Sequence, residues 1–538
     1  MQLLYDTLKE NFEKQLDIMK KTILFLMLML LSGTPTMISA QQQGYTNPVI
    51  PGFYPDPSAC RVGDDYYLVT STFEYFPGVP VFHSKDLIHW TQIGFCLTRK
   101  SQLPLDNCAA SGGIYAPTIR YHKGTFYMTT TNVSGGGNFY VTATDPAGPW
   151  SDPIYMKQGG IDPTIFFEGD KAYFISTANG ITLSEIDINT GKMLGESHVL
   201  WRGTGGRYPE GPHLYQKDGY YYLLIAEGGT EYGHKVTIAR SRTLLGPYES
   251  NPANPILTHI NENAQNNPIQ GLGHADLIQA PDSSWWMIHL GFRIQSGLHH
   301  LLGRETFLAP VRWDENAWPV VNGNGTINLT MDCKTLPQVV APPTPQLLDF
   351  SEKTIPLEWT YLRNPEMSHY KLIPEQGIFR LNGTAVTIDE AKSPTFIGRR
   401  QQHIRFVATT LLKQWNTGKD GRGGVTVYMN NSSHYDLYVT QKGGKSYLEV
   451  RCRLGKIDQV IKSVPISRQP ISLKVEGGER EYTFSYSQDG KKFTSLTQLD
   501  TKYLSSETTG TFTGVFIALF AEGVQSQLDF DSFEYMGK

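Results

Sequence analysis

The stretch DPTIFFEGDKAYFIST, residues 162–177, decides the fold, because the chain contains five copies of its pattern. Each copy opens with a segment of the form x-Pro-x-apolar, with Ala in place of Pro in the last copy. A turn of Gly, Asp or Ser follows, and then an aromatic pair and an aliphatic or Thr-rich run. This order is typical of a β-hairpin. The copies begin at Asp56, Ala116, Asp162, Gly211 and His274.

The spacing of the copies predicts a β-propeller. Consecutive copies begin about 55 residues apart on average, near the length of propeller blades with loop insertions. Strand-like segments such as FYVTATD and VTIARS lie between the copies, so each copy is expected to form a blade of about four strands. We predict a five-bladed β-propeller over residues 44–340. The alternative is a β-sandwich whose strands resemble one another by chance.

The C-terminal part of the chain has a different character. VVAPPTPQ, residues 339–346, is rich in proline, and we expect a linker at 341–346. Strand-like segments separated by Gly, Asn, Asp and Ser turns fill residues 347–538. They predict a jelly-roll, lectin-like β-sandwich. The 538 residues are therefore expected to form an all-β protein of two domains.

The N-terminal segment is typical of a signal peptide. Lys20 and Lys21 precede the apolar run at 23–31, and a small residue, Ala40, offers a cleavage point. The apolar run is too short to span a bilayer by itself. Residues 1–40 are expected to comprise the signal peptide and an upstream extension, with the start of translation at Met1 or Met19 left open. The mature protein would be exported, to the periplasm or the extracellular space; an uncleaved anchor is the alternative.

Charge and cysteine content exclude several classes of partner and site. The formal net charge is −4 and no long run of one sign occurs, which argues against nucleic acid and against an anionic membrane. The five cysteines are odd in number and match no zinc motif. We expect separate buried thiols, with a pair between Cys96 and Cys108 as the alternative.

The opening residues of the five copies indicate a site on the propeller axis. The first strand of each blade lines the central channel, so Asp56 and Asp162 are expected to face one pocket. In the fourth copy the acid comes one residue early, as Glu210, between Pro209 and Gly211. Glycoside hydrolysis requires an acid and a base that are held apart. A calcium cage is the competing interpretation, but the small residues and the histidine at the other openings argue against a complete one.

Eight ordered motifs resemble glycoside hydrolase family 43, and within it the two-domain β-xylosidases and α-L-arabinofuranosidases. The resemblance runs from about residue 44 to the C-terminus. The motifs are NPVIPGFYPDPS, GDDYYLVTSTFEYFPGVPVFHSKDLIHW, GGIYAPTIRY, GGIDPTIFF, RYPEGPHLY, LLIAEGGTEYGH, GLGHADL and LGRETFLAPVRW.

The resemblance implies an inverting hydrolase with three catalytic carboxyl groups. Asp56 would be the general base that takes a proton from water, and Glu210 the general acid that protonates the leaving oxygen. Asp162 would position Glu210 and raise its pKa by its own charge. Inversion requires the base and the acid to lie about 6.5–9.5 Å apart, which leaves room for the water.

The resemblance also implies a set of substrate-binding residues. Arg304 would contact sugar hydroxyls, with a structural ion pair as the alternative, and Phe512 would reach the pocket mouth from the second domain, with a place in the sandwich core as the alternative. Tyr115 departs from the family, in which tryptophan is common, and this puts the fine subsite preference in doubt. The full set is Phe73, Tyr115, Thr230, His274, Arg304 and Phe512.

The expected function is that of an exo-glycosidase that removes terminal β-1,4-linked xylose from xylo-oligosaccharides in xylan degradation. The alternative is an α-L-arabinofuranosidase or a bifunctional enzyme; a more remote one is a non-catalytic carbohydrate-binding protein. The expected partner is a xylo-oligosaccharide or arabinoxylan fragment, with no nucleic acid and no membrane in the mature form. We expect no required cofactor and assign no metal ligand. A structural calcium and a homo-oligomer stay open.

Overall fold

The computed structural model describes residues 44–295, 297–333, 335–337, 339 and 347–538. The predicted signal peptide and the linker at 341–346 lie outside these ranges. Within them the regular structure is almost entirely β-strand, as predicted, and no helix is long and apolar enough to cross a membrane. The helical turns described are η1 (Met367–His369), η2 (Pro374–Gln376), η3 (Thr501–Leu504) and α2 (Ser506–Thr509).

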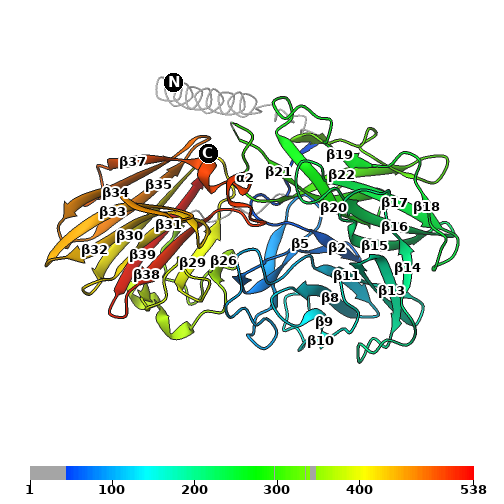
Figure 1. The fold of residues 1–538 in the computed structure, drawn as a ribbon, viewed down its shortest axis with the longest axis horizontal. Helices are drawn as coiled ribbons and strands as arrows, with labels where there is room; N and C mark the ends of the chain where they lie inside the picture. The colour runs from blue at the N-terminus through cyan, green and yellow to red at the C-terminus, as the bar shows by residue number, and fades with distance from the viewer. Residues whose placement is uncertain (1–43, 296, 334, 338, 340–346) are drawn as a thin grey trace, which may run out of the picture. The chain divides into compact units, whose positions relative to one another are not determined.

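Five antiparallel sheets form the blades of a propeller, and the strands of each blade follow chain order, except for the last strand of the fourth blade (Figure 1). Blades 1 and 2 consist of β2 (Ser58–Val62), β3 (Asp65–Val69), β5 (Gly78–Ser84) and β6 (Thr91–Leu97), and of β7 (Thr118–His122), β8 (Thr125–Asn132), β9 (Gly137–Ala143) and β10 (Ile154–Tyr155). Blade 3 consists of β11 (Ile161–Glu168), β12 (Lys171–Ala178), β13 (Gly180–Ile186) and β14 (His198–Trp201). Blade 4 contains β15 (Glu210–Lys217), β16 (Tyr220–Glu227), β17 (Lys235–Ser241), β18 (Glu249–Ser250) and β19 (Leu257–Thr258), which pairs with β17. Blade 5 contains β20 (Ile269–Gln279), β21 (Trp285–Arg293), β22 (Glu305–Trp313) and β23 (Pro319–Val321).

The first strands of the blades close a ring around the propeller axis. β2 contacts β7, β7 contacts β11, β11 contacts β15, β15 contacts β20, and β20 returns to β2. The five sequence copies coincide with the first two strands of each blade, so the prediction of hairpins and of a five-bladed propeller is confirmed. The ring brings the starts of five segments that are far apart in the sequence to one place.

The C-terminal part forms a sandwich of two antiparallel sheets, as predicted. One sheet contains β27 (Tyr370–Ile373), β28 (Ile378–Asn382), β39 (Gln527–Gly537), β30 (Phe406–Asn416), β35 (Ile471–Gly477), β36 (Glu481–Ser487) and β37 (Thr494–Asp500), with β25 (Leu347–Leu348) on β39. The other contains β34 (Ile457–Ile466), β33 (Lys445–Leu454), β32 (Ser433–Lys442), β31 (Arg422–Asn430), β38 (Phe516–Glu522), β29 (Thr395–Arg400) and β26 (Trp359–Leu362). A further pair joins β1 (Gly44–Thr46) to β24 (Thr330–Asp332).

One strand of the propeller segment belongs to the sandwich. β4 (Tyr75–Phe76), which lies between two strands of blade 1 in the sequence, pairs with β26 through Tyr361 and Leu362. Tyr75 also stacks on Phe516 of β38, with ring centroids 4.0 Å apart. The two domains are therefore joined by backbone pairing as well as by side chains.

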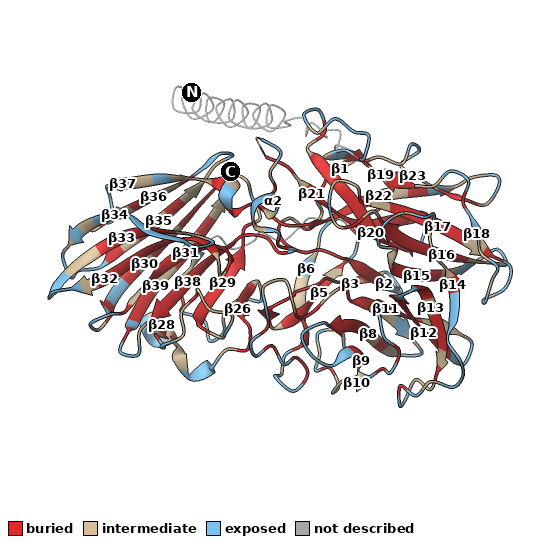
Figure 2. Ribbon diagram, in the orientation of Figure 1, coloured by how far each residue is buried: buried red, intermediate tan, exposed pale blue. Residues whose placement is uncertain are grey.

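Alternating burial along the strands supplies the core of the sandwich. In β35 the buried residues are Ile471, Leu473 and Val475, and the residues between them are partly exposed. This period of two is expected for a strand with one face on the core. Figure 2 shows buried residues, in red, along the strands of the sandwich and of the blades.

A buried polar network holds the ring of first strands together. The guanidinium of Arg120 on β7 donates to a carboxylate oxygen of Asp276 on β20 at 2.8 Å. Ser58 and Tyr215, from β2 and β15, donate hydroxyl hydrogen bonds to the same carboxylate at 2.7 and 2.6 Å. Burial raises the pKa of Asp276, but Arg120 and the other donors outweigh it and hold the pKa well below its usual value. Four of the five blades thus share one carboxylate.

All five cysteines are buried and free, so the expectation of separate thiols is confirmed and Cys96 and Cys108 do not pair.

We predict that Asp276→Ala lowers the free energy of unfolding by about 3–5 kcal/mol, because it leaves the buried Arg120 without its counter-ion. Urea unfolding followed by tryptophan fluorescence measures the change. The matched control is Asp170→Ala, which removes an exposed partner of Lys123 and should leave the unfolding midpoint where it is. Equal effects of the two substitutions would show that the axial network does not stabilise the ring.

Candidate active site

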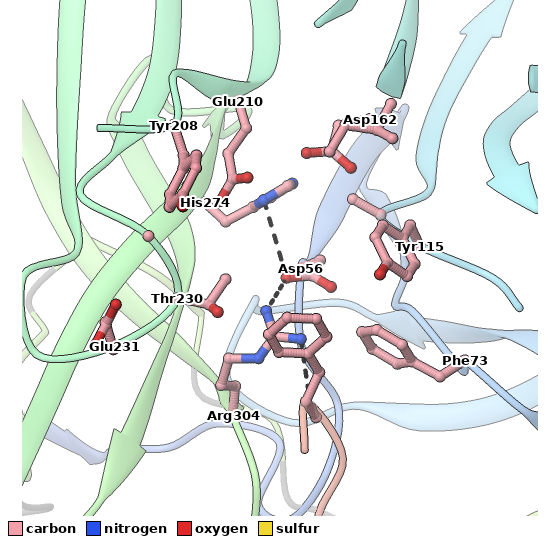
Figure 3. A pocket seen from close by; sticks show the side chains of 14 residues that line it. Asp56, Phe73, Tyr115, Asp162, Tyr208, Glu210, Thr230, Glu231, His274 and Arg304 are labelled. Atoms are coloured by element: carbon pink, nitrogen blue, oxygen red, sulfur yellow. Dashed lines mark hydrogen bonds and ion pairs between the residues drawn. The ribbon is translucent and has the colours of Figure 1, made fainter. Parts of the chain in front are cut away.

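One pocket, with a cavity volume of about 370 Å³, lies where the openings of the five copies converge (Figure 3). All nine residues named from the sequence line it: Asp56, Phe73, Tyr115, Asp162, Glu210, Thr230, His274, Arg304 and Phe512. Its other lining residues are Ala116, Ile161, Tyr208, Gly229 and Glu231. Every blade contributes at least one side chain, and Phe512 comes from the sandwich. The ring of first strands therefore produces a site that no single blade contains.

The opening residue of four of the five copies has a left-handed backbone. The angle φ is 55° at Asp56, 54° at Asp162, 59° at Gly211 and 43° at His274. This conformation costs a residue with a Cβ of order 1–3 kcal/mol, and such residues cluster at functional sites. In blades 3, 4 and 5 the register of the first two strands also shifts at this point, and such bulges redirect side chains. The backbone thus turns the acids and the histidine into the pocket.

Packing against His274 explains why the fourth copy carries its acid one residue early. A Cβ at Gly211 would lie 2.8 Å from Cε1 of His274, closer than real Cβ contacts. No side chain fits at the opening position of this copy. Glu210, the first residue of β15, stands beside it instead, and its longer side chain reaches the same pocket.

Asp56 is held as a carboxylate by its neighbours. Arg304 donates to Oδ1 from Nη1 at 2.7 Å, Ser71 donates its hydroxyl to Oδ2, and Nδ1 of His274 lies 3.9 Å from Oδ1. Burial raises the pKa of Asp56, but Arg304, His274 and the Ser71 hydrogen bond together outweigh it, and the pKa lies below its usual value. Arg304 therefore forms an ion pair, which was the alternative to its predicted contact with sugar hydroxyls. It also lines the pocket.

The pKa values of Asp162 and Glu210 are raised, which favours the protonated form of each group. Burial, with the charge of Asp56 second, raises the pKa of Glu210 to about 7. Burial, Glu210 and Asp56 raise the pKa of Asp162 well above its usual value. Burial contributes most to the raised pKa values of this pair. The charge interaction between Asp162 and Glu210 that the sequence predicts adds to it, and so does the charge of Asp56.

Asp162 also contacts the backbone beside Glu210. The N–H of Gly211 donates to Oδ2 of Asp162 at 3.3 Å. This hydrogen bond joins the start of β11 to the start of β15, and it fixes the peptide that carries Glu210.

Three aromatic rings form one wall of the pocket. The ring centroids of Phe73 and Tyr115 lie 5.3 Å apart, and those of Phe73 and Phe512 lie 6.0 Å apart. Phe512 is 40% exposed, so it is not a core residue of the sandwich. Its N–H donates to the hydroxyl of Ser111 at 2.9 Å, and its carbonyl accepts from Arg304 at 3.4 Å. The rings are tilted against one another, and together they give the pocket an apolar side next to its charged groups, which suits the apolar face and the hydroxyl groups of a sugar ring.

Three residues at the site were missed by sequence reasoning. Tyr208 and Glu231 line the pocket, and Nε2 of His234 lies 3.9 Å from Oε1 of Glu210. Tyr208 and His234 stand within two of the motifs noted above, but nothing in the spacing showed that they face Glu210. No group of three or more His, Cys, Asp or Glu within the described ranges is arranged to hold a metal ion, so no calcium ligands are assigned.

Comparison with known proteins identifies both domains. The model of glycosyl hydrolases family 43 matches residues 45–319, and that of the β-xylosidase C-terminal concanavalin A-like domain matches residues 348–536.

Named relatives match over nearly their full lengths. A non-reducing end α-L-arabinofuranosidase of Bacteroides ovatus is 42% identical over 96% of this chain and 99% of its own. A xylosidase/arabinosidase of Butyrivibrio fibrisolvens is 40% identical over 88% of this chain and 95% of its own. The crystal structure of a xylan β-1,4-xylosidase of Bacillus halodurans has a TM-score of 0.87 at 33% identity and covers 91% of this chain and 99% of its own. The chain therefore belongs to glycosyl hydrolases family 43 and is a glycoside hydrolase.

Proposed function

We propose that the chain is an inverting exo-glycosidase that removes single pentoses from chain ends, with terminal β-1,4-linked xylose as the main substrate. The observation that carries the proposal is the division of charge among three buried carboxyl groups in one pocket. Asp56 is held ionised, whereas Glu210 and Asp162 are held towards their protonated forms. A base and an acid of this kind in one site are what glycoside hydrolysis requires.

Asp56 is the general base in this proposal. Its carboxylate is fixed from two sides by Arg304 and Ser71, so a water bound to it would be held in one orientation towards the anomeric carbon. Its lowered pKa keeps it ionised in mildly acidic solution, where Glu210 is still protonated. The two residues can therefore hold the required protonation states at the same time.

Glu210 is the general acid and Asp162 its positioning partner. Glu210 gives its proton to the leaving oxygen, and the leaving sugar departs as an alcohol. Asp162 fixes the backbone beside Glu210 through the N–H of Gly211. The added charge of Asp56 supports the protonated form of Glu210 until the substrate arrives.

Phe512 supports the exo mode of action. The sandwich inserts this ring beside Phe73 and Tyr115, so the pocket has a wall from each domain. A site that is enclosed in this way takes the end of a chain more readily than its middle.

α-L-Arabinofuranose is a second candidate substrate, and two observations favour it. The relatives named above include an α-L-arabinofuranosidase and a xylosidase/arabinosidase. Tyr115, which is half-buried against Phe73, stands where the family commonly has tryptophan, and its smaller ring leaves more room in the wall for a five-membered sugar.

Paired chromogenic substrates and product stereochemistry test the proposal. We expect turnover of p-nitrophenyl β-D-xyloside, and in second place of p-nitrophenyl α-L-arabinofuranoside. Proton NMR during hydrolysis of the β-xyloside should show α-xylose first, because the water attacks the face opposite the leaving group. Turnover of neither substrate, or β-xylose as the first product, would refute the proposal.

Substitution of the two catalytic carboxyl groups should have different signatures. Asp56→Ala is expected to lower kcat/KM by about 10²–10⁴-fold on every substrate, because the attacking water needs a base whatever the leaving group is. Glu210→Ala should lower kcat/KM as strongly for xylobiose. The loss should be much smaller for a 2,4-dinitrophenyl pentoside, because its dinitrophenolate leaving group departs without a proton. The surface variant Asp170→Ala is the control. The assignment of the base to Asp56 and the acid to Glu210 is wrong if the two variants lose activity in the same proportion on both substrates.

The pH dependence of kcat/KM follows from the opposed pKa shifts. Activity requires ionised Asp56 and protonated Glu210. Activity should therefore persist into acidic solution, since the pKa of Asp56 is lowered, and should fall as the pH rises through about 7, where Glu210 loses its proton. The profile is measured with xylobiose, and circular dichroism at each pH confirms that the protein stays folded. A rate that is unchanged up to pH 9 would contradict the assignment of Glu210 as the acid.

A further inference from the structure

His234 lies next to Glu210 and takes no part in the mechanism described so far. It directly precedes β17, and its side chain is completely buried. Nδ1 lies 3.3 Å from the carbonyl oxygen of Gly271. A carbonyl oxygen only accepts hydrogen bonds, so this contact places the ring hydrogen on Nδ1.

The ring is neutral at the pH at which the enzyme would work. Burial, followed by His274 and Arg304, lowers the pKa of His234 to about 3. With its one hydrogen on Nδ1, the neutral imidazole carries a lone pair on Nε2. Nε2 is therefore a hydrogen-bond acceptor and not a donor.

The position of the ring is fixed by its surroundings. A Cβ at Gly273 would lie 2.2 Å from Cε1 of His234, so the backbone of β20 lies flat against the ring. The backbone of His234 is also held, because its N–H donates to the backbone carbonyl of Glu231 at 2.9 Å and its own carbonyl accepts from the hydroxyl of Thr258 at 3.0 Å. The imidazole therefore has little freedom to turn to another partner.

Nε2 has no hydrogen-bond partner among the described residues, and Oε1 of Glu210 lies 3.9 Å from it. A buried polar atom without a partner is costly and calls for an explanation. A movement of about 1 Å by the Glu210 side chain would bring the two atoms to hydrogen-bonding distance. Only the protonated carboxyl group can then donate, since an ionised one would present its own lone pairs to Nε2.

We propose that His234 is a positioning residue for the general acid, and that its Nε2 accepts a hydrogen bond from protonated Glu210 in the enzyme without substrate. The inference rests on the proposed role of Glu210 as the acid. Because the bond stabilises only the protonated form, Glu210 keeps its proton to higher pH, and its side chain is oriented before the substrate binds. The leaving oxygen of the substrate then takes over the hydrogen bond.

Other groups around Glu210 also affect its proton and must be held constant in a test. Those that face the same pocket or lie against His234 are Asp56, Tyr115, Asp162, Tyr208, Glu231, His274 and Arg304. A substitution of His234 leaves all of them in place.

Two variants separate the acceptor from the rest of the side chain. His234→Asn retains an amide near the place of Nδ1, which can still donate to Gly271, but lacks an acceptor near the place of Nε2. His234→Gln puts an amide oxygen near the place of Nε2. Each is assayed across pH on a phenyl pentoside, which needs the acid, and on the 2,4-dinitrophenyl analogue, which does not.

We expect the alkaline limb of kcat/KM for the phenyl pentoside to move about one pH unit lower in His234→Asn, which is a loss of about tenfold above that limb. Turnover of the dinitrophenyl pentoside should be nearly unchanged, and His234→Gln should restore most of the limb. An unmoved limb, or an equal loss on both substrates, overturns the proposal, because a purely structural role would affect both alike.

Failure of the proposed function is recognised separately. Wild-type enzyme that hydrolyses neither the xyloside nor the arabinofuranoside of either leaving group refutes the function itself, before any variant is compared. If His234→Asn does not fold, as judged by its thermal transition, His234→Ala replaces it, because it also lacks an acceptor near the place of Nε2. A limb moved to lower pH in His234→Ala and restored in His234→Gln supports the acceptor role, and an unmoved limb in His234→Ala overturns it.

Discussion

The ion pair between Arg304 and Asp56 decides how three carboxyl groups share one buried pocket. Without a cation, burial would favour the protonated form of all three, and none could act as a base. Arg304 donates to Asp56 alone among them, so one carboxyl stays ionised. The charge on Asp56 in turn helps to raise the pKa of the other two. Arg304, supported by His274 and Ser71, thus separates the base from the acid.

The geometry behind this pairing depends on closure of the propeller. Asp56, Glu210 and Arg304 come from blades 1, 4 and 5, and the carboxylate of Asp276 joins four first strands through hydrogen bonds. The sandwich completes the pocket and does not stand apart from it. β4 pairs with β26, Phe512 is tied to Ser111, and residues 45–538 form one compact unit. Both domains are therefore required for a complete site.

Much of this could be read from the sequence, because repeats and acids leave a local signal. The five copies predicted the blades, and the equivalence of their openings predicted that positions 56, 162 and 210 would meet.

The displaced acid at Glu210 was visible in the sequence, but the cause of the displacement was not. The cause is the contact between Gly211 and His274, which lie on two different blades. The same limit hid His234, whose relation to Glu210 depends on how closely the backbone at Gly273 approaches it. The pairing of β4 with a strand of the sandwich had no signal in the sequence either, because a strand of two residues is too short to show alternating burial. The charge interaction between Asp162 and Glu210 was predicted, but the larger contribution of burial to both pKa values was not, because burial depends on the closed fold.

The most direct test of the division of charge is a crystal structure of the Asp56→Asn variant with an unhydrolysed terminal pentoside. The account predicts the end sugar against Phe73, Tyr115 and Phe512, with its glycosidic oxygen about 2.6–3.2 Å from Glu210. It also predicts a water between the side chain at position 56 and the anomeric carbon, and about 6.5–9.5 Å between the side-chain groups at positions 56 and 210. A sugar bound outside this pocket, or a separation of about 5–5.5 Å with no room for water, would contradict it.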